Sequence, residues 1–135
     1  MDWDTTQATI QIPDLAIQVK VRRGFFKKEW VDIQSYLLSN THCIIKTDEL
    51  FPINEKITLS LILSLDPSDL IIDSITANVL NQKKECSCFF YHLEFNQESI
   101  KAPLGSESPI SRMVELIEKK QLINKKVLDL SHAST

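Results

Sequence analysis

Glycine is scarce in this sequence, with 2 residues in a chain of 135. This scarcity argues against a glycine-rich phosphate-binding loop and against long flexible linkers. A basic excess is also lacking, because the net charge is −3 and the isoelectric point is about 5.6. Proteins that bind duplex DNA are usually basic, so nucleic acid is not the expected main partner.

Long apolar runs are missing as well, and no segment approaches the length of a membrane-spanning helix. The chain begins with an acidic stretch where a secretory signal peptide would be basic. The 3 cysteines, Cys43, Cys86 and Cys88, form an odd set that fits a reducing compartment. We therefore expect a cytoplasmic protein without membrane insertion.

The residues that usually carry catalysis or metal binding are few and scattered. His42, His92 and His132 show no spacing typical of a metal site. Cys43 follows His42 directly, but neighbouring residues on a strand point to opposite faces and make a poor nucleophile–base pair. The sequence thus predicts no enzyme, no metal and no resident cofactor.

Alternation of apolar and polar residues is the strongest pattern present, and it predicts strands. We expect strands over residues 15–21, 30–38, 43–47, 56–63, 70–80 and 86–95, with a polar hairpin loop at 81–85. In the second strand Leu37 is expected on the inward side, and in the fifth strand Ile71 is. Asp73 is in phase with that inward side. It could be an acid in a site, a polar group at a barrel rim, or the mark of a bulge. Short strands with regular turns are typical of a barrel or a sandwich.

After residue 95 the pattern changes to that of a helix. Ser108 suits the N-cap and Pro109 the first helical position, and Ile110, Met113 and Ile117 follow at helical spacing. We expect a polar arm over 1–14, the β-domain over 15–96, a linker over 97–107, a helical segment over 108–130 and a tail over 131–135. The apolar stretch 122–130 could extend the helix or form a second docking stretch. It could also dock within the chain or pair with another chain in a homo-oligomer.

One local concentration of positive charge interrupts the acidic background. It is a hairpin in which basic and aromatic residues alternate: Lys20, Arg22, Arg23, Phe25, Phe26, Lys27, Lys28 and Trp30. Cations beside aromatic rings suit phosphate contact together with base stacking. The alternative is a solvated hairpin whose lysines protect a strand edge.

The order of the segments between residues 30 and 96 carries a family resemblance. A strand enters a turn with Ser39, a short strand ends at Thr47, and a leucine-rich strand and a long strand follow. The last strand closes with Tyr91, His92, Leu93, Glu94 and Phe95. This stretch resembles a PilZ domain, the bacterial module known for binding cyclic di-GMP. The resemblance implies a mainly β fold, a six-stranded antiparallel barrel with a C-terminal α-helix.

The ligand motifs of that family are largely missing. Its paired arginines, R-x-x-x-R, should precede the first strand, but residues 1–14 contain no Arg or Lys. Its D/N-x-S-x-x-G motif aligns with Leu37, Ser39 and His42, of which only Ser39 matches. Each lost charge-assisted bond is worth about 1.5–3 kcal/mol, against about 8 kcal/mol for micromolar affinity. The usual mode of cyclic di-GMP binding is therefore not expected.

The resemblance implies a divergent PilZ-like adaptor that binds protein partners in bacterial cyclic di-GMP-related signalling, near motility, pili or biofilm formation. One alternative is a cyclic di-GMP receptor with a rearranged site that uses Arg22, Arg23 and Lys28 from the hairpin. Ser39 and His42 complete the candidate ligand-binding residues. The other alternative is a small-barrel binder of single-stranded nucleic acid that uses the aromatic residues of the same hairpin.

Overall fold

The computed structural model describes residues 12–100 and 108–133, with side chains along the C-terminal helix as far as residue 123. Most of the expected N-terminal arm, residues 101–107 of the expected linker and residues 134–135 of the expected tail lie outside this range. The described elements are β1 (Leu15–Arg23), β2 (Lys27–Leu38), β3 (His42–Thr47), β4 (Lys56–Leu63), β5 (Leu70–Glu85), β6 (Cys88–Phe95), the 3₁₀-helix η2 (Gln97–Ser99) and α1 (Pro109–Ala133).

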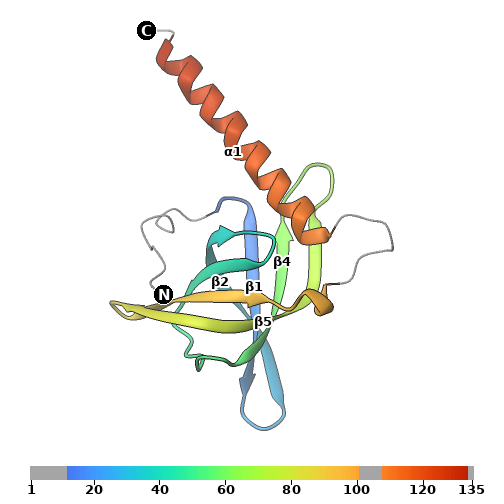
Figure 1. Cartoon of the computed structure of the whole chain (residues 1–135), viewed down its shortest axis with the longest axis vertical. Helices are drawn as coiled ribbons and strands as arrows, with labels where there is room; N and C mark the ends of the chain where they lie inside the picture. The colour runs from blue at the N-terminus through green and yellow to red at the C-terminus, as the bar shows by residue number, and fades with distance from the viewer. Residues whose placement is uncertain (1–11, 101–107, 134–135) are drawn as a thin grey trace.

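The six strands form a closed barrel in the order β1-β2-β3-β6-β5-β4, and every neighbouring pair is antiparallel. The predicted six-stranded antiparallel barrel with a C-terminal helix is therefore confirmed. Because neighbours run in opposite directions, each loop belongs to one of two ends. We call the end that carries α1 the helix end, and the opposite end, where β1 turns into β2, the far end (Figure 1).

The barrel interior is filled by the alternate apolar residues of the strands, as the period of two predicts. Ile17, Val19, Leu59, Leu61, Ile75, Ala77, Val79, Tyr91 and Leu93 are almost completely buried. Ile110, Met113 and Ile117 of α1 belong to the same cluster and close the helix end. Full burial of such a side chain contributes roughly 1.5–3 kcal/mol before entropic costs, so the helix start is firmly attached.

The C-terminal part of α1 leaves the barrel and projects into space (Figure 1). It runs without interruption to Ala133, so the residues 122–130 continue the helix, one of the two arrangements left open by the sequence. Among the described residues, the last ion pair between α1 and the rest of the chain joins Lys120 to Asp14. Within the described residues, no helix combines the length and the apolar character needed to cross a bilayer.

Bulges overturn two of the side-chain orientations expected from simple alternation. In β2 the register shifts between Ser35 and Leu37, so Leu37 pairs with Ile44 and packs on the outer face of the barrel. In β5 a bulge lies opposite the step from Leu59 to Leu61, so Ile72 is buried and Ile71 is exposed. Asp73 lies in this bulge and is exposed, which explains why an acid seemed to face the core.

The polar segment 81–85, expected as a hairpin loop, is instead the end of strand β5. Here β5 and β6 extend beyond the barrel as a ribbon, and the turn is confined to Cys86 and Ser87, with Cys86 at φ 57°. A ribbon with solvent on both faces needs no alternation, so its sequence resembles a loop. At the other boundary, Ile12 is buried and its N–H donates to the Ser35 carbonyl at 2.8 Å, so the barrel unit starts before residue 15.

Candidate functional site

The candidate site residues fall into two groups at opposite ends of the barrel. Arg22, Arg23 and Lys28 lie at the far end, whereas Ser39 and His42 lie at the helix end, in the turn from β2 to β3. Strand β2, which is 12 residues long, separates the groups and carries them at its opposite ends. They cannot contribute to one small-molecule site.

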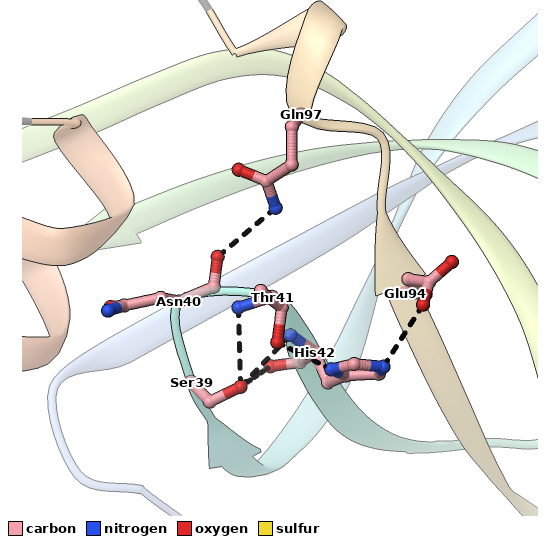
Figure 2. Close-up of polar contacts among 6 residues, drawn as sticks. All are labelled: Ser39, Asn40, Thr41, His42, Glu94 and Gln97. Carbon is pink, nitrogen blue, oxygen red and sulfur yellow. Dashed lines mark hydrogen bonds and ion pairs between the residues drawn. The ribbon is translucent and has the colours of Figure 1, made fainter.

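The turn at the helix end is held by the Ser39 side chain (Figure 2). Its Oγ accepts the backbone N–H of His42 at 3.0 Å and that of Thr41 at 3.4 Å, and it donates to the His42 carbonyl at 3.2 Å. A serine in such a turn satisfies backbone groups that have no strand partner. Ser39 is thus engaged in shaping the turn.

His42 joins this turn to strand β6 (Figure 2). Its Nδ1 lies 2.6 Å from the Thr41 hydroxyl, and its Nε2 lies 3.3 Å from a carboxylate oxygen of Glu94. The ring of His92 is 5.0 Å away between centroids, and partial burial, followed by the charge of His42, lowers the pKa of His92. Both nitrogens of His42 therefore have partners on neighbouring protein groups. Within the described residues, no group of three or more His, Cys, Asp or Glu is placed to hold a metal ion.

A cleft of about 360 Å³ opens at the far end. Four cationic side chains line it, from three different strands: Lys20, Arg22, Lys28 and Lys56. Glu55 lies among them, and Leu50, Phe51 and Pro52 supply an apolar wall. The structure therefore brings Arg22 and Lys28 together with two further lysines, neither of which was among the predicted site residues, although Lys20 belongs to the basic hairpin noted in the sequence.

The cleft forms because strand β1 stops pairing with β4 while it continues to pair with β2. Pairing between β1 and β4 ends at Val19 and Leu59, whereas pairing between β1 and β2 continues to Arg23 and Lys27. The space beside the departing strand is bounded by the loop that joins β3 to β4. The position of Lys56 beside Arg22 thus follows from barrel closure, which spacing along the sequence does not reveal.

A buried tyrosine fixes this loop. The Tyr91 hydroxyl donates to the Glu49 carbonyl at 2.8 Å and accepts from the Phe51 N–H at 2.9 Å and from Gln82 Nε2 at 3.2 Å. Sequence reasoning placed Tyr91 on the inward side of its strand but assigned it no role. The available signal was its hydroxyl, since a buried tyrosine usually finds a hydrogen-bond partner.

The basic residues of the hairpin differ in their ion pairing. Arg23 contacts Glu49 at 2.5 Å and Glu29 at 3.8 Å, and the hydrogen bond and charge of Glu49 raise its pKa. In the part of the chain that the structure describes, Arg22 and Lys28 form no ion pair. Of the two predicted arginines, Arg22 therefore faces the cleft, while Arg23 holds the hairpin against the loop.

The tip of the hairpin presents two aromatic side chains to solvent. Phe25 and Phe26 are 90% and 102% exposed and lie in the turn formed by residues 24–26, where Gly24 has φ 76°. A positive φ favours glycine, which explains why one of the few glycines lies here. Further back, the ammonium of Lys20 lies 5.7 Å from the ring centroid of Trp30.

The class of protein that these observations define is a closed six-stranded antiparallel barrel, capped by a helix at one end and bearing a basic, aromatic hairpin at the other. Comparisons with protein-family models, with curated proteins and with solved structures found no match. The PilZ resemblance therefore remains a prediction drawn from the sequence.

Proposed function

We propose that this protein is a non-enzymatic adaptor of the bacterial cytoplasm that binds a protein partner through the projecting part of α1. Following the sequence resemblance, we place it in cyclic di-GMP-related signalling, near motility, pili or biofilm formation. The single observation that carries the binding role is the helix itself, which extends well beyond the barrel that it caps (Figure 1).

The projecting part of the helix exposes apolar side chains. Leu122 and Ile123 are 54% and 60% exposed. An amphipathic helix with an uncovered apolar face is a common ligand for grooves in other proteins. Exposed apolar groups in such a position therefore support contact with a partner more readily than a role in stability.

The helix-end turn supports a function that does not depend on the usual nucleotide site. Ser39 bonds within its own turn, and His42 bonds to Thr41 and Glu94. Leu37, which stands where an amide or acid would be needed, packs on Ile44 and Phe90. None of these three side chains is presented as a recognition group for a guanine edge.

The test is site-specific photo-crosslinking from position 122 in the source bacterium, with identification of the protein captured. We expect Leu122→Asp with Ile123→Asp to abolish the adduct formed by a second crosslinker at position 119. The matched control is Glu118→Gln with Lys119→Gln, with the crosslinker at position 122. It changes polar residues of the same exposed part of the helix and should leave the adduct intact. Loss of the adduct in the control, or its persistence in the aspartate variant, would contradict the proposal.

Self-association is the competing explanation for an exposed apolar helix. Sedimentation of the full chain beside a chain that ends after Lys120 separates the two. The adaptor proposal expects both to be monomers. A dimer formed by the full chain alone would make this segment a homo-oligomer contact instead.

A second candidate function is cyclic di-GMP binding in the cleft at the far end. The observation that favours it is the convergence of Arg22 and Lys28 with Lys20 and Lys56 around a space large enough for a phosphate-bearing ligand. Isothermal titration calorimetry with cyclic di-GMP tests it. If the protein binds tighter than about 10 μM, and the binding disappears in the variant Arg22→Ala with Lys28→Ala, the protein is a cyclic di-GMP receptor and the adaptor proposal is wrong.

A further inference from the structure

We infer that the far end of the barrel docks on an anionic phospholipid bilayer, with Phe25 and Phe26 entering the headgroup region and the surrounding cations contacting lipid phosphates. The inference rests on the hairpin and the cleft, and it is independent of the role proposed for α1. It concerns shallow contact with one leaflet and involves no membrane-spanning segment.

Phe25 and Phe26 form an uncovered aromatic tip on the hairpin. Both are almost fully exposed, and they are adjacent in the turn at the end of a projecting ribbon (Figure 1). Nothing in the described barrel covers them. Two aromatic rings in water at a convex tip favour transfer to an apolar or interfacial phase. A convex tip also suits a deformable phase, since it needs no preformed pocket.

The cations of the hairpin lie a short distance behind its tip. Arg22 and Lys28 are directly paired across the hairpin, and the turn residues 24–26 extend beyond this pair. Two residues of extended chain correspond to about 7 Å. Interfacial elements typically bury their apolar part about 5–10 Å below the phosphate level. The tip can therefore reach the acyl boundary while Arg22 and Lys28 remain among the phosphates.

The surface around the hairpin and the cleft carries a local excess of positive charge. Among the cations of the hairpin and the cleft, those that form no ion pair with a described residue are Lys20, Arg22, Lys27, Lys28 and Lys56. The acids nearby are Glu29 and Glu49, which both pair with Arg23, Asp48, whose charge also acts on Arg23, and Glu55 in the cleft. The far end is therefore locally basic in a chain of net charge −3. This polarity favours an anionic surface approached with the far end first.

The layered arrangement favours a bilayer over single-stranded nucleic acid. In a nucleic-acid strand each base lies beside its phosphate, so aromatic platforms and cations alternate across one protein surface. Here the Phe25 and Phe26 rings lie ahead of the cations, as the hydrocarbon of a leaflet lies beneath its phosphates. The same orientation leaves α1, at the opposite end, directed away from the membrane (Figure 1).

The test is flotation of the full chain with vesicles of phosphatidylcholine alone or mixed with phosphatidylglycerol. We expect binding to the mixed vesicles only, weakening as salt is raised. Phe25→Ser with Phe26→Ser should lower the partition constant at least about tenfold. Lys27→Gln with Lys28→Gln should lower it by about 25-fold, since each basic residue near an anionic surface contributes about fivefold.

Two matched controls use residues outside the β1–β2 hairpin and outside the cleft. Leu122→Ser with Ile123→Ser removes an exposed apolar pair on α1, and Lys83→Gln with Lys84→Gln neutralises a basic pair on the other ribbon. Both should bind vesicles like the parent protein. An added tryptophan, Phe26→Trp, should be quenched by brominated lipids beyond the parental signal. Unchanged circular dichroism and thermal unfolding would show that the variants remain folded.

Several outcomes would overturn the inference. These are equal binding to neutral vesicles, no binding to either kind, or loss of binding in the α1 control but not in the phenylalanine variant. A polynucleotide that binds the parent protein, fails to bind the same hairpin variants and competes with vesicles would assign the hairpin to nucleic acid instead.

Discussion

Replacing Tyr91 by phenylalanine removes a single hydroxyl from the interior and tests how the wall of the cleft is held. That hydroxyl makes three hydrogen bonds, two of them to the backbone of the loop between β3 and β4. The ring can stay in place, because phenylalanine has the same shape apart from the missing oxygen. The change therefore isolates the hydrogen bonds from the packing.

The expected cost follows from what each partner loses. Gln82 is exposed and can turn to water, so its bond contributes little. The Glu49 carbonyl and the Phe51 N–H are left without their partner, and Phe51 is buried. A net loss of about 1–1.5 kcal/mol for each of these two bonds gives a total of about 2–3 kcal/mol. For a domain of this size the melting temperature should fall by roughly 6–15 °C.

Urea unfolding followed by circular dichroism measures the effect. The midpoint should fall while the dependence of the free energy on urea stays unchanged, since the folded state keeps its fold. Tyr36→Phe is the matched control, because among the described residues its hydroxyl bonds only to Gln34, at an exposed site and a distance of 3.0 Å. We expect it to cost less than about 0.5 kcal/mol. A Tyr91→Phe variant as stable as the Tyr36→Phe variant would refute the assignment of Tyr91 as the anchor of the loop.

Three further predictions concern other parts of the barrel. Burial raises the pKa of the Cys43 thiol well above its ordinary value. Cys43 should therefore react with a thiol reagent only after unfolding, whereas the exposed Cys86 should react at once. Rapid modification of Cys43 in the folded protein would contradict this. The lowered pKa of His92 means that the folded state binds fewer protons than the unfolded chain below about pH 6.5, so stability should fall as the pH drops through that value. His92→Gln should make the fall in urea midpoint between neutral and mildly acidic pH smaller, and an unchanged fall would count against the shift. Ser39→Ala removes the acceptor for two backbone N–H groups and should destabilise the fold by about 1 kcal/mol in the same unfolding assay; no change in midpoint would mean that the turn does not depend on this side chain.

The sequence predicted the strands whose inner faces form the core, because burial of one face enforces a period of two. The prediction failed where that constraint is relaxed. At the bulges near Leu37 and Asp73 one extra residue reverses the phase. The acid at Asp73 is compatible with a bulge but also with two other arrangements, and nothing in the composition near Leu37 marks the position. Along residues 81–85 both faces of the ribbon meet solvent, so a strand carries the composition of a loop.

The candidate site was predicted less well, for a topological reason. Spacing along the chain shows that Arg22, Arg23 and Lys28 are close together in a hairpin. It does not show that Arg23 pairs with Glu49, or that Lys56 from β4 joins Arg22 in the cleft. These neighbours are brought together by barrel closure, in which β1 meets β4 across a long separation in sequence.

The early end of the pairing between β1 and β4 has a consequence for association. Within the described pairings, β1 follows β4 no further than Val19, and β5 follows β4 no further than Asn78. Both strands continue past these points, so a closed barrel still presents two short lengths of strand edge at its far end. Such edges can recruit a strand from another molecule unless charge opposes it. The arginines of β1 and Lys83 and Lys84 of β5 lie along these lengths. Replacing them with apolar residues should therefore promote edge-to-edge polymerisation of the protein.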